Sequence, residues 1–125
     1  MGLFSKDRVE LGDGGLSVES DYFSYEIPYS EIKDVHLRDP FDFEVGDMVE
    51  GSRKVLSQCG KFRNREYGPY SLLFHVTSKL FILLDFGKDG HLVFNLKDME
   101  GTKNFYRRLK NIVKTSSPEP IRDRL

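Results

Sequence analysis

Residues 70–96, with the sequence YSLLFHVTSKLFILLDFGKDGHLVFNL, decide the fold class of this chain. Apolar side chains recur at every second position in three segments, 70–77, 80–87 and 91–96, and a period of two is that of a β-strand. The short links TSK and GKDG separate the segments. Because links of this kind join neighbouring strands, the pattern predicts three consecutive strands in an antiparallel meander.

The hydrophobic period changes to that of a helix directly after this stretch. Asp98 is the predicted N-cap, and Glu100 lies in the first turn, where a carboxylate suits the helix dipole. The apolar positions then follow the helical spacing, and they are Met99, Thr102, Phe105, Tyr106, Leu109, Ile112 and Val113. SSPEP (116–120) ends this pattern. We therefore expect one amphipathic C-terminal helix whose apolar face closes the core.

Shorter strands are expected in the N-terminal part of the chain. Residues 8–11 predict one strand, and GDGG (12–15) predicts a tight turn, because glycine adopts positive φ without strain. Residues 16–27 read as one further strand, which Pro28 interrupts. In the next strand the buried positions change parity, which predicts a turn or bulge near Lys33; the expected buried set is Ile32, Val35 and Leu37.

The length of 125 residues predicts one domain over residues 1–115, followed by a tail at 116–125. Cys59 is the only cysteine of the chain, which excludes an intramolecular disulfide and favours a reducing compartment. No stretch approaches the ~20 apolar residues of a membrane span, and the N-terminus carries no signal-like apolar run. We therefore expect a cytoplasmic protein.

The net charge of −1 conceals an asymmetry between the two parts of the chain. Residues 1–50 carry four Lys and Arg against thirteen Asp and Glu, a net charge of −9, whereas residues 51–125 carry fifteen against seven, a net charge of +8. This polarity favours attraction between the two parts, or contact between copies of the chain. It does not fit a uniformly basic nucleic-acid binder, so we do not expect nucleic acid as a partner.

The candidate binding residues are five bases within residues 53–65, namely Arg53, Lys54, Lys61, Arg63 and Arg65. One interpretation is an anion-binding surface for a phosphate-bearing headgroup, a nucleotide or an acidic peptide, since Arg contacts phosphate and carboxylate in a bidentate way. The other interpretation is structural. Phe62 and Tyr70 then belong to the core, the bases line a solvated strand face, and they pair with the acidic residues of segment 39–50.

The sequence offers no pattern for catalysis or for a metal site. Cys59 has no histidine near it in sequence, and no nucleophile motif surrounds it. The three histidines and the cysteine lack metal-ligand spacing, and the acidic run 39–50 lacks the EF-hand order of ligands. We therefore expect no enzyme activity, no metal and no cofactor.

Three stretches resemble the bacterial pleckstrin-homology-like (PH-like) domains: IPYSEIKDV (27–35), GKFRNREYGPYSLLF (60–74) and LVFNLKDMEGTKNFYRRLK (92–110). The likeness covers about residues 16–113. It implies a bent antiparallel barrel of about seven strands, closed by the C-terminal helix. Phosphoinositide-binding PH domains carry a Lys-x(n)-Arg-x-Arg pattern in the first hairpin. Here no base lies between Arg8 and Lys33, so the likeness does not imply phosphoinositide recognition of that type.

Taken together, these features predict a mainly β, non-catalytic PH-like module that binds a protein or peptide partner, with self-association as one form of this. An open edge of the sheet would accept a strand of the partner, and the five bases would tune the encounter electrostatically. The alternative is a binder of anionic ligands or lipid headgroups at the cytoplasmic membrane surface through the basic segment 53–65.

Overall fold

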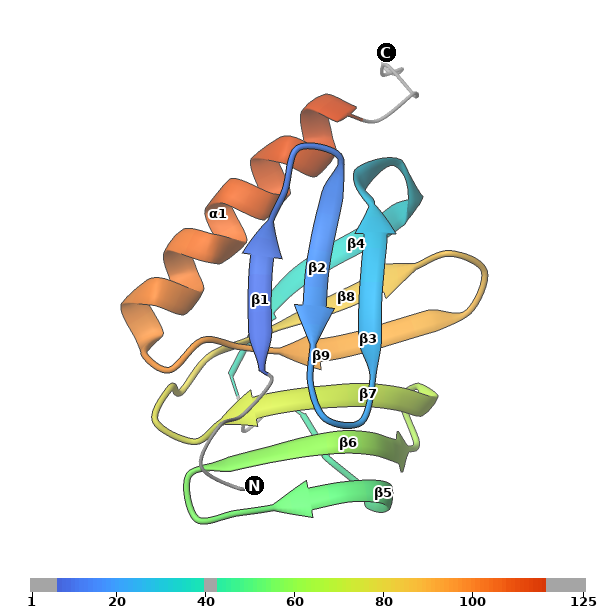
Figure 1. Cartoon of the computed structure of the whole chain (residues 1–125), viewed down its shortest axis with the longest axis vertical. Helices are drawn as coiled ribbons and strands as arrows, with labels where there is room; N and C mark the ends of the chain where they lie inside the picture. The colour runs from blue at the N-terminus through green and yellow to red at the C-terminus, as the bar shows by residue number, and fades with distance from the viewer. Residues whose placement is uncertain (1–6, 40–42, 117–125) are drawn as a thin grey trace.

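The computed structural model describes residues 7–39 and 43–116, which form nine strands, one short 3-10 helix and one α-helix (Figure 1). The elements are β1 (Arg8–Leu11), β2 (Gly15–Glu19), β3 (Ser24–Pro28), η1 (Tyr29–Glu31), β4 (Ile32–Arg38), β5 (Asp47–Arg53), β6 (Ser57–Asn64), β7 (Gly68–His75), β8 (Phe81–Phe86), β9 (Gly90–Phe94) and α1 (Met99–Ser116). The protein is therefore mainly β with one C-terminal helix, as the sequence predicts. Of the expected tail, residues 117–125 lie outside the described residues.

The strands form two sheets. A three-stranded antiparallel sheet has the order β1-β2-β3, and a six-stranded sheet has the order β4-β8-β9-β7-β6-β5. The strands of the small sheet run across those of the large one (Figure 1). Over residues 7–39 and 43–116 the two sheets remain separate and form no closed barrel.

The expectation of one strand over residues 16–27 is wrong, because this segment is a hairpin. β2 and β3 pair with each other in antiparallel register, and residues 20–23 turn the chain between them. The backbone N–H of Ser20 donates to the carbonyl of Phe23 at 2.8 Å, and the Ser20 hydroxyl accepts from the N–H of Tyr22 at 3.1 Å. Ser and Asp favour such turns because their short side chains bond to nearby backbone, and this local signal outweighs the strand propensity of the aromatic residues.

The predicted bulge in β4 is confirmed. Its register with β8 shifts between Ile32 and Asp34. Ile32 and Val35 are buried and Leu37 is half-buried. The bulge turns these three apolar side chains toward the same side of the sheet despite their unequal spacing.

The prediction of an antiparallel meander over residues 70–96 is wrong in its strand order. β8 does not follow β7 in the sheet. Instead β9 lies between them, parallel to β7 and antiparallel to β8. The link from β7 to β8 therefore skips one strand position, which β9 fills.

The side chain of Asn95 holds this arrangement together. Asn95 directly follows β9 and is fully buried. Its Oδ1 accepts from the backbone N–H of His75 at 2.7 Å, and its Nδ2 donates to the carbonyls of His75 and Leu80 at 3.0 and 3.1 Å. One amide thus joins the end of β9 to the end of β7 and to the residue before β8.

The start of α1 is joined to the same region. The Asp98 carboxylate accepts from the N–H of Gly101, which confirms Asp98 as the N-cap. The buried Thr102 hydroxyl donates to the carbonyl of Asp98 at 2.8 Å and accepts from the N–H of Leu96 at 3.1 Å. The helix therefore begins at a fixed place relative to β9.

The main hydrophobic core lies between the small sheet, α1 and one face of the large sheet, here called the inner face. Its buried residues include Leu16, Val18, Ile27, Val35, Leu73, Ile82, Leu84, Leu92, Phe94, Phe105 and Leu109. The predicted role of the helix is confirmed, because Phe105 and Leu109 of α1 lie in this core.

A second core covers the opposite, outer face of the large sheet. It is rich in aromatic side chains, and its buried residues are Phe43, Phe62, Tyr70, Leu72, Phe81, Leu83 and Val93. The Tyr70 hydroxyl donates to the carbonyl of Val45 at 2.6 Å. Burial raises the pKa of this hydroxyl, so it stays a donor at neutral pH. The segment that begins at Phe43 is thereby fixed onto the sheet before β5 starts.

We predict that Asn95→Leu destabilises the protein by roughly 3 kcal/mol, since it leaves buried backbone groups of His75 and Leu80 without partners and each costs about 1–3 kcal/mol. Urea unfolding followed by circular dichroism measures this loss. Asn104→Leu is the matched control, because Asn104 is exposed on α1, and it should change the free energy of unfolding by less than about 0.5 kcal/mol. Equal losses in the two variants would show that the Asn95 amide does not hold the strands.

Candidate functional site

The two edge strands of the six-stranded sheet differ in how they are covered. At one edge α1 packs on β4, and the Lys110 ammonium donates to the carbonyl of Val35 at 3.0 Å. At the other edge β5 pairs with β6 alone. Among residues 7–39 and 43–116, no strand pairs with β5 on the edge that points away from β6. Figure 1 shows β5 at the lower margin of the molecule. A row of backbone N–H and C=O groups is therefore open to a partner.

β5 also exposes apolar side chains. Met48 is 38% exposed and Val49 is 66% exposed. The register between β5 and β6 shifts between Met48 and Glu50, so Val49 is the extra residue of a bulge. Asp47, Glu50 and Arg53 place charges along the same strand, which is a common protection of an edge against unspecific pairing.

Glycines allow β5 to lie close to β6. Gly51 and Gly60 face each other in the ladder. Gly60 has φ +144°, and a Cβ on it would lie 2.2 Å from the carbonyl oxygen of Glu50. A side chain at this position would therefore push β5 away from the sheet.

The structure separates the five predicted binding residues. Lys61 and Arg63 lie together on the inner face of β6, where both are exposed. Arg53 lies on the other face, with its guanidinium 5.6 Å from the centre of the Phe62 ring. Lys54 is exposed in the turn between β5 and β6, and Arg65 is exposed in the turn between β6 and β7. The five bases do not share one face.

Acidic residues stand opposite three of these bases. In the register of β5 with β6, Asp47 pairs with Arg63 and Glu50 pairs with Lys61. Arg65 forms an exposed ion pair with Glu44 at 3.6 Å. Phe62 and Tyr70 are buried. For Lys61, Arg63 and Arg65, this placement agrees with the structural interpretation of the segment, in which its bases face the acids of segment 39–50.

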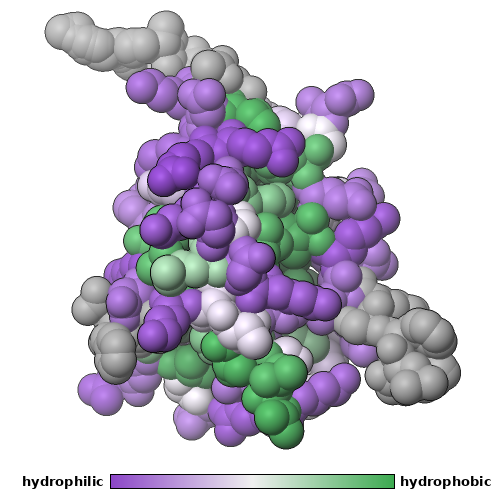
Figure 2. Space-filling view, turned by 90° about the vertical axis from the view of Figure 1, so that its left-hand side faces the viewer, coloured by the Kyte–Doolittle hydropathy of each residue, from purple (hydrophilic) through white to green (hydrophobic). Residues whose placement is uncertain are grey.

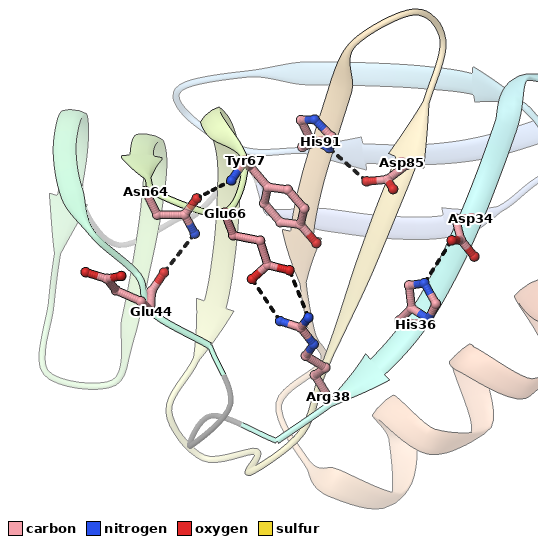
Figure 3. Close-up of polar contacts among 9 residues, drawn as sticks. All are labelled: Asp34, His36, Arg38, Glu44, Asn64, Glu66, Tyr67, Asp85 and His91. Atoms are coloured by element: carbon pink, nitrogen blue, oxygen red, sulfur yellow. Dashed lines mark hydrogen bonds and ion pairs between the residues drawn. The ribbon is translucent and has the colours of Figure 1, made fainter.

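A polar network on the outer face links the β6–β7 turn to distant parts of the chain (Figure 3). The Arg38 guanidinium donates to both carboxylate oxygens of Glu66 at 3.0 and 2.8 Å. The side chain of Asn64 donates to the carbonyl of Glu44 and accepts from the N–H of Tyr67, both at 2.8 Å. The network therefore fixes the turn and the segment that leads into β5.

Two acid–histidine pairs complete this network, and the sequence analysis did not single them out. Asp34 bonds to His36 at 2.9 Å, and Asp85 bonds to His91 at 2.8 Å (Figure 3). Asp34 and Asp85 face each other across β4 and β8, and Tyr67 stacks on His91 with ring centres 4.4 Å apart. The signal was present: Asp34 and His36 are two apart in one strand, and Asp85 and His91 flank the β8–β9 turn.

These pairs contain an oriented base but no nucleophile. No described Ser, Thr or Cys side chain is hydrogen-bonded to His36 or His91. Cys59 is half-buried on β6, and burial, followed by the charge of Asp7, raises the pKa of its thiol. At neutral pH Cys59 is therefore a thiol rather than a reactive thiolate.

Within the described part of the chain, no three His, Cys, Asp or Glu side chains are arranged so that they can hold a metal ion. The same residues include no helix with the length and apolar character needed to cross a membrane. Comparisons of this chain with protein-family models, with curated proteins and with solved structures found no match. The candidate site is therefore defined by the structure alone, and its clearest element is the open edge of β5.

We predict that Gly60→Ala loosens β5 from the sheet. The new Cβ would meet backbone atoms of both Glu50 and Gly51, at 2.2 and 2.4 Å. Gly68→Ala is the control, because Gly68 also has positive φ, +73°, but a Cβ there meets nothing within 4 Å. Urea unfolding should show a loss of about 1–3 kcal/mol in the control from φ strain alone and a larger loss in Gly60→Ala. Similar losses would mean that no close approach holds β5 in place.

Proposed function

We propose that this protein is a non-catalytic interaction module that binds an extended strand of a protein partner along β5. The observation that carries the proposal is the contrast between the two edges of the large sheet: α1 covers β4, whereas β5 is open and exposes Met48 and Val49. An added strand satisfies the open backbone groups, and its side chains contact those of the edge strand.

The charges of the β5–β6 hairpin give such a partner its orientation. On the inner face, Asp47 and Glu50 lie on the edge strand itself, with Arg63 and Lys61 one strand further in. A partner strand with basic residues on this face is therefore favoured, and an acidic one is disfavoured. A second copy of the chain presents the same open edge, but its β5 carries the same acids, Asp47 and Glu50, so this charge argument favours a basic strand over a second copy.

The relation to PH-like domains belongs to this proposal. Two features support it, a sheet crossed by a second sheet and a C-terminal helix packed beside them. Two features depart from it, the parallel pairing of β7 with β9 and the open arrangement of the sheets over the described residues. The proposed binding mode depends on the β5 edge and not on this relation.

A second candidate function is contact with an anionic membrane surface, and one observation favours it. The β5–β6 turn places Lys54 beside two exposed apolar side chains, Val55 at 91% and Leu56 at 60% exposure. Figure 2 shows apolar surface at the lower end of the molecule, over this turn. Apolar tips next to bases insert into the headgroup region of membranes. The acids opposite Lys61, Arg63 and Arg65 weaken this candidate.

The test of the proposed function is selection of random displayed peptides on the immobilised full chain, followed by affinity measurement with the best synthetic peptide. The double variant Met48→Lys with Val49→Lys should weaken binding about tenfold or more, because lysine on an edge strand blocks strand addition. Arg63→Glu with Arg65→Glu is the matched surface control and should leave the affinity within about threefold. In an added strand, every second N–H group of the peptide bonds to β5 and the others point away from it. N-methylation of the first set should abolish binding, and N-methylation of the second set should leave it unchanged.

Peptides that bind equally well to the β5 variant, or that tolerate N-methylation of both sets, would overturn the proposal. The variant Lys54→Glu with Leu56→Asn separates the second candidate, because both residues lie in the β5–β6 turn. If the protein sediments with phosphatidylserine vesicles at low salt, and this variant abolishes sedimentation while the β5 variant retains it, the membrane is the partner. Light scattering of the free protein then shows whether a second copy occupies the edge.

A further inference from the structure

A cavity of about 570 Å³ opens between the two sheets, outside the β5 edge. The start of β1 forms one wall, the end of β7 and the residues after β9 form the floor, and the β5–β6 turn forms the rim. Figure 1 shows the beginning of β1 near the ends of β9 and β7. Pockets of roughly 300–1,000 Å³ hold small organic ligands in proteins, so this cavity has the right size for one.

The interior of the cavity is apolar. Leu73 in the floor is fully buried, and Val9 and Leu96 are half-buried around it. All three belong to the main hydrophobic core or pack against it. Leu56, at the rim, is 60% exposed. The cavity therefore continues the core toward solvent, and an apolar ligand would replace the side chains that are missing at this end.

Most polar groups of the lining already have partners. The Asn95 amide bonds to His75 and Leu80 with both of its ends. The Thr77 hydroxyl donates to the carbonyl of Lys97. Arg8 forms an ion pair with Glu19 at 3.4 Å. Few polar groups of the lining are therefore left to form a hydrogen bond or an ion pair with a ligand.

The side chain of Lys97 is exposed, and no described residue forms a hydrogen bond or an ion pair with its ammonium. His75, in the same lining, is half-buried, and burial lowers the pKa of its ring, so it is uncharged at neutral pH. Among the described residues of the lining, the charged side chains are Asp7, Arg8 and Lys97, and Arg8 is already paired with Glu19. A ligand carboxylate can therefore pair with the Lys97 ammonium, whereas a ligand cation placed there would meet a like charge.

We propose that this cavity binds a small amphipathic carboxylate, with its apolar chain against Val9, Leu56 and Leu96 and its carboxylate at Lys97. The inference is independent of the proposed function, because no residue of β5 lines the cavity. Small-molecule sites usually have a mostly apolar lining that contacts the body of the ligand and a few polar groups that fix its orientation.

The test compares three probes that share one chain and differ in their head groups: octanoate, 1-octanol and octylammonium. Titration of the isotope-labelled full chain, followed by amide chemical shifts, should show saturable shifts at Val9, Leu56, His75 and Leu96. Octanoate should bind at least about tenfold tighter than octylammonium, with 1-octanol between them. Lys97→Gln should remove the preference of octanoate over 1-octanol, and Lys79→Gln, an exposed lysine outside the lining, should retain it.

The apolar part of the site has its own pair of variants. Leu56→Asn changes the rim and should weaken all three probes, whereas Val55→Asn changes the neighbouring residue, which is 91% exposed and outside the lining, and should weaken none. Both positions are exposed, so both variants should fold, and thermal unfolding checks this. Equal affinity for the three head groups, shifts centred elsewhere on the protein, or no saturable binding would overturn the proposal.

Discussion

The buried side-chain amide of Asn95 determines the order of the central strands. It joins the end of β9 to the last residue of β7 and to the residue before β8. Since a buried amide left without partners is costly, these three strand ends must meet at one place. β9 consequently lies between β7 and β8 and pairs with β7 in parallel, and the crossover segment that joins these two strands contains β8.

This strand order leads to both surfaces discussed above. With β9 at the centre, β4 becomes one edge of the large sheet, next to α1, and β5 becomes the other edge, with no cover among the described residues. The aromatic layer on the outer face holds the segment that leads into β5, through Tyr70 and Asn64. Asn95 also lies in the floor of the cavity, so one residue contributes to the position of the edge and to the shape of the cavity.

The sequence predicts those parts of the fold that depend on local patterns. The strands in residues 70–96, the bulge near Lys33, the N-cap at Asp98 and the apolar face of α1 all follow from periodicity or capping. The strand order does not, because it depends on contacts of Asn95 with residues far apart in the sequence. The sequence pattern does not predict β5 either, because its bulge and its charges interrupt the alternation of apolar and polar residues that is typical of a strand. The placement of the five bases needed the register of β6, which only the sheet defines.

The central claim is that β5 presents an open edge in the free protein. Amide hydrogen exchange of the full chain, measured by nuclear magnetic resonance at a concentration where light scattering shows a monomer, tests this directly. Residues of β5 whose N–H groups point away from β6 should exchange rapidly, while their neighbours that bond to β6 are protected. The β4 strand beside α1 should show more uniform protection. Uniform slow exchange along β5 in the monomer would mean that another part of the chain already covers this edge, and would contradict the account.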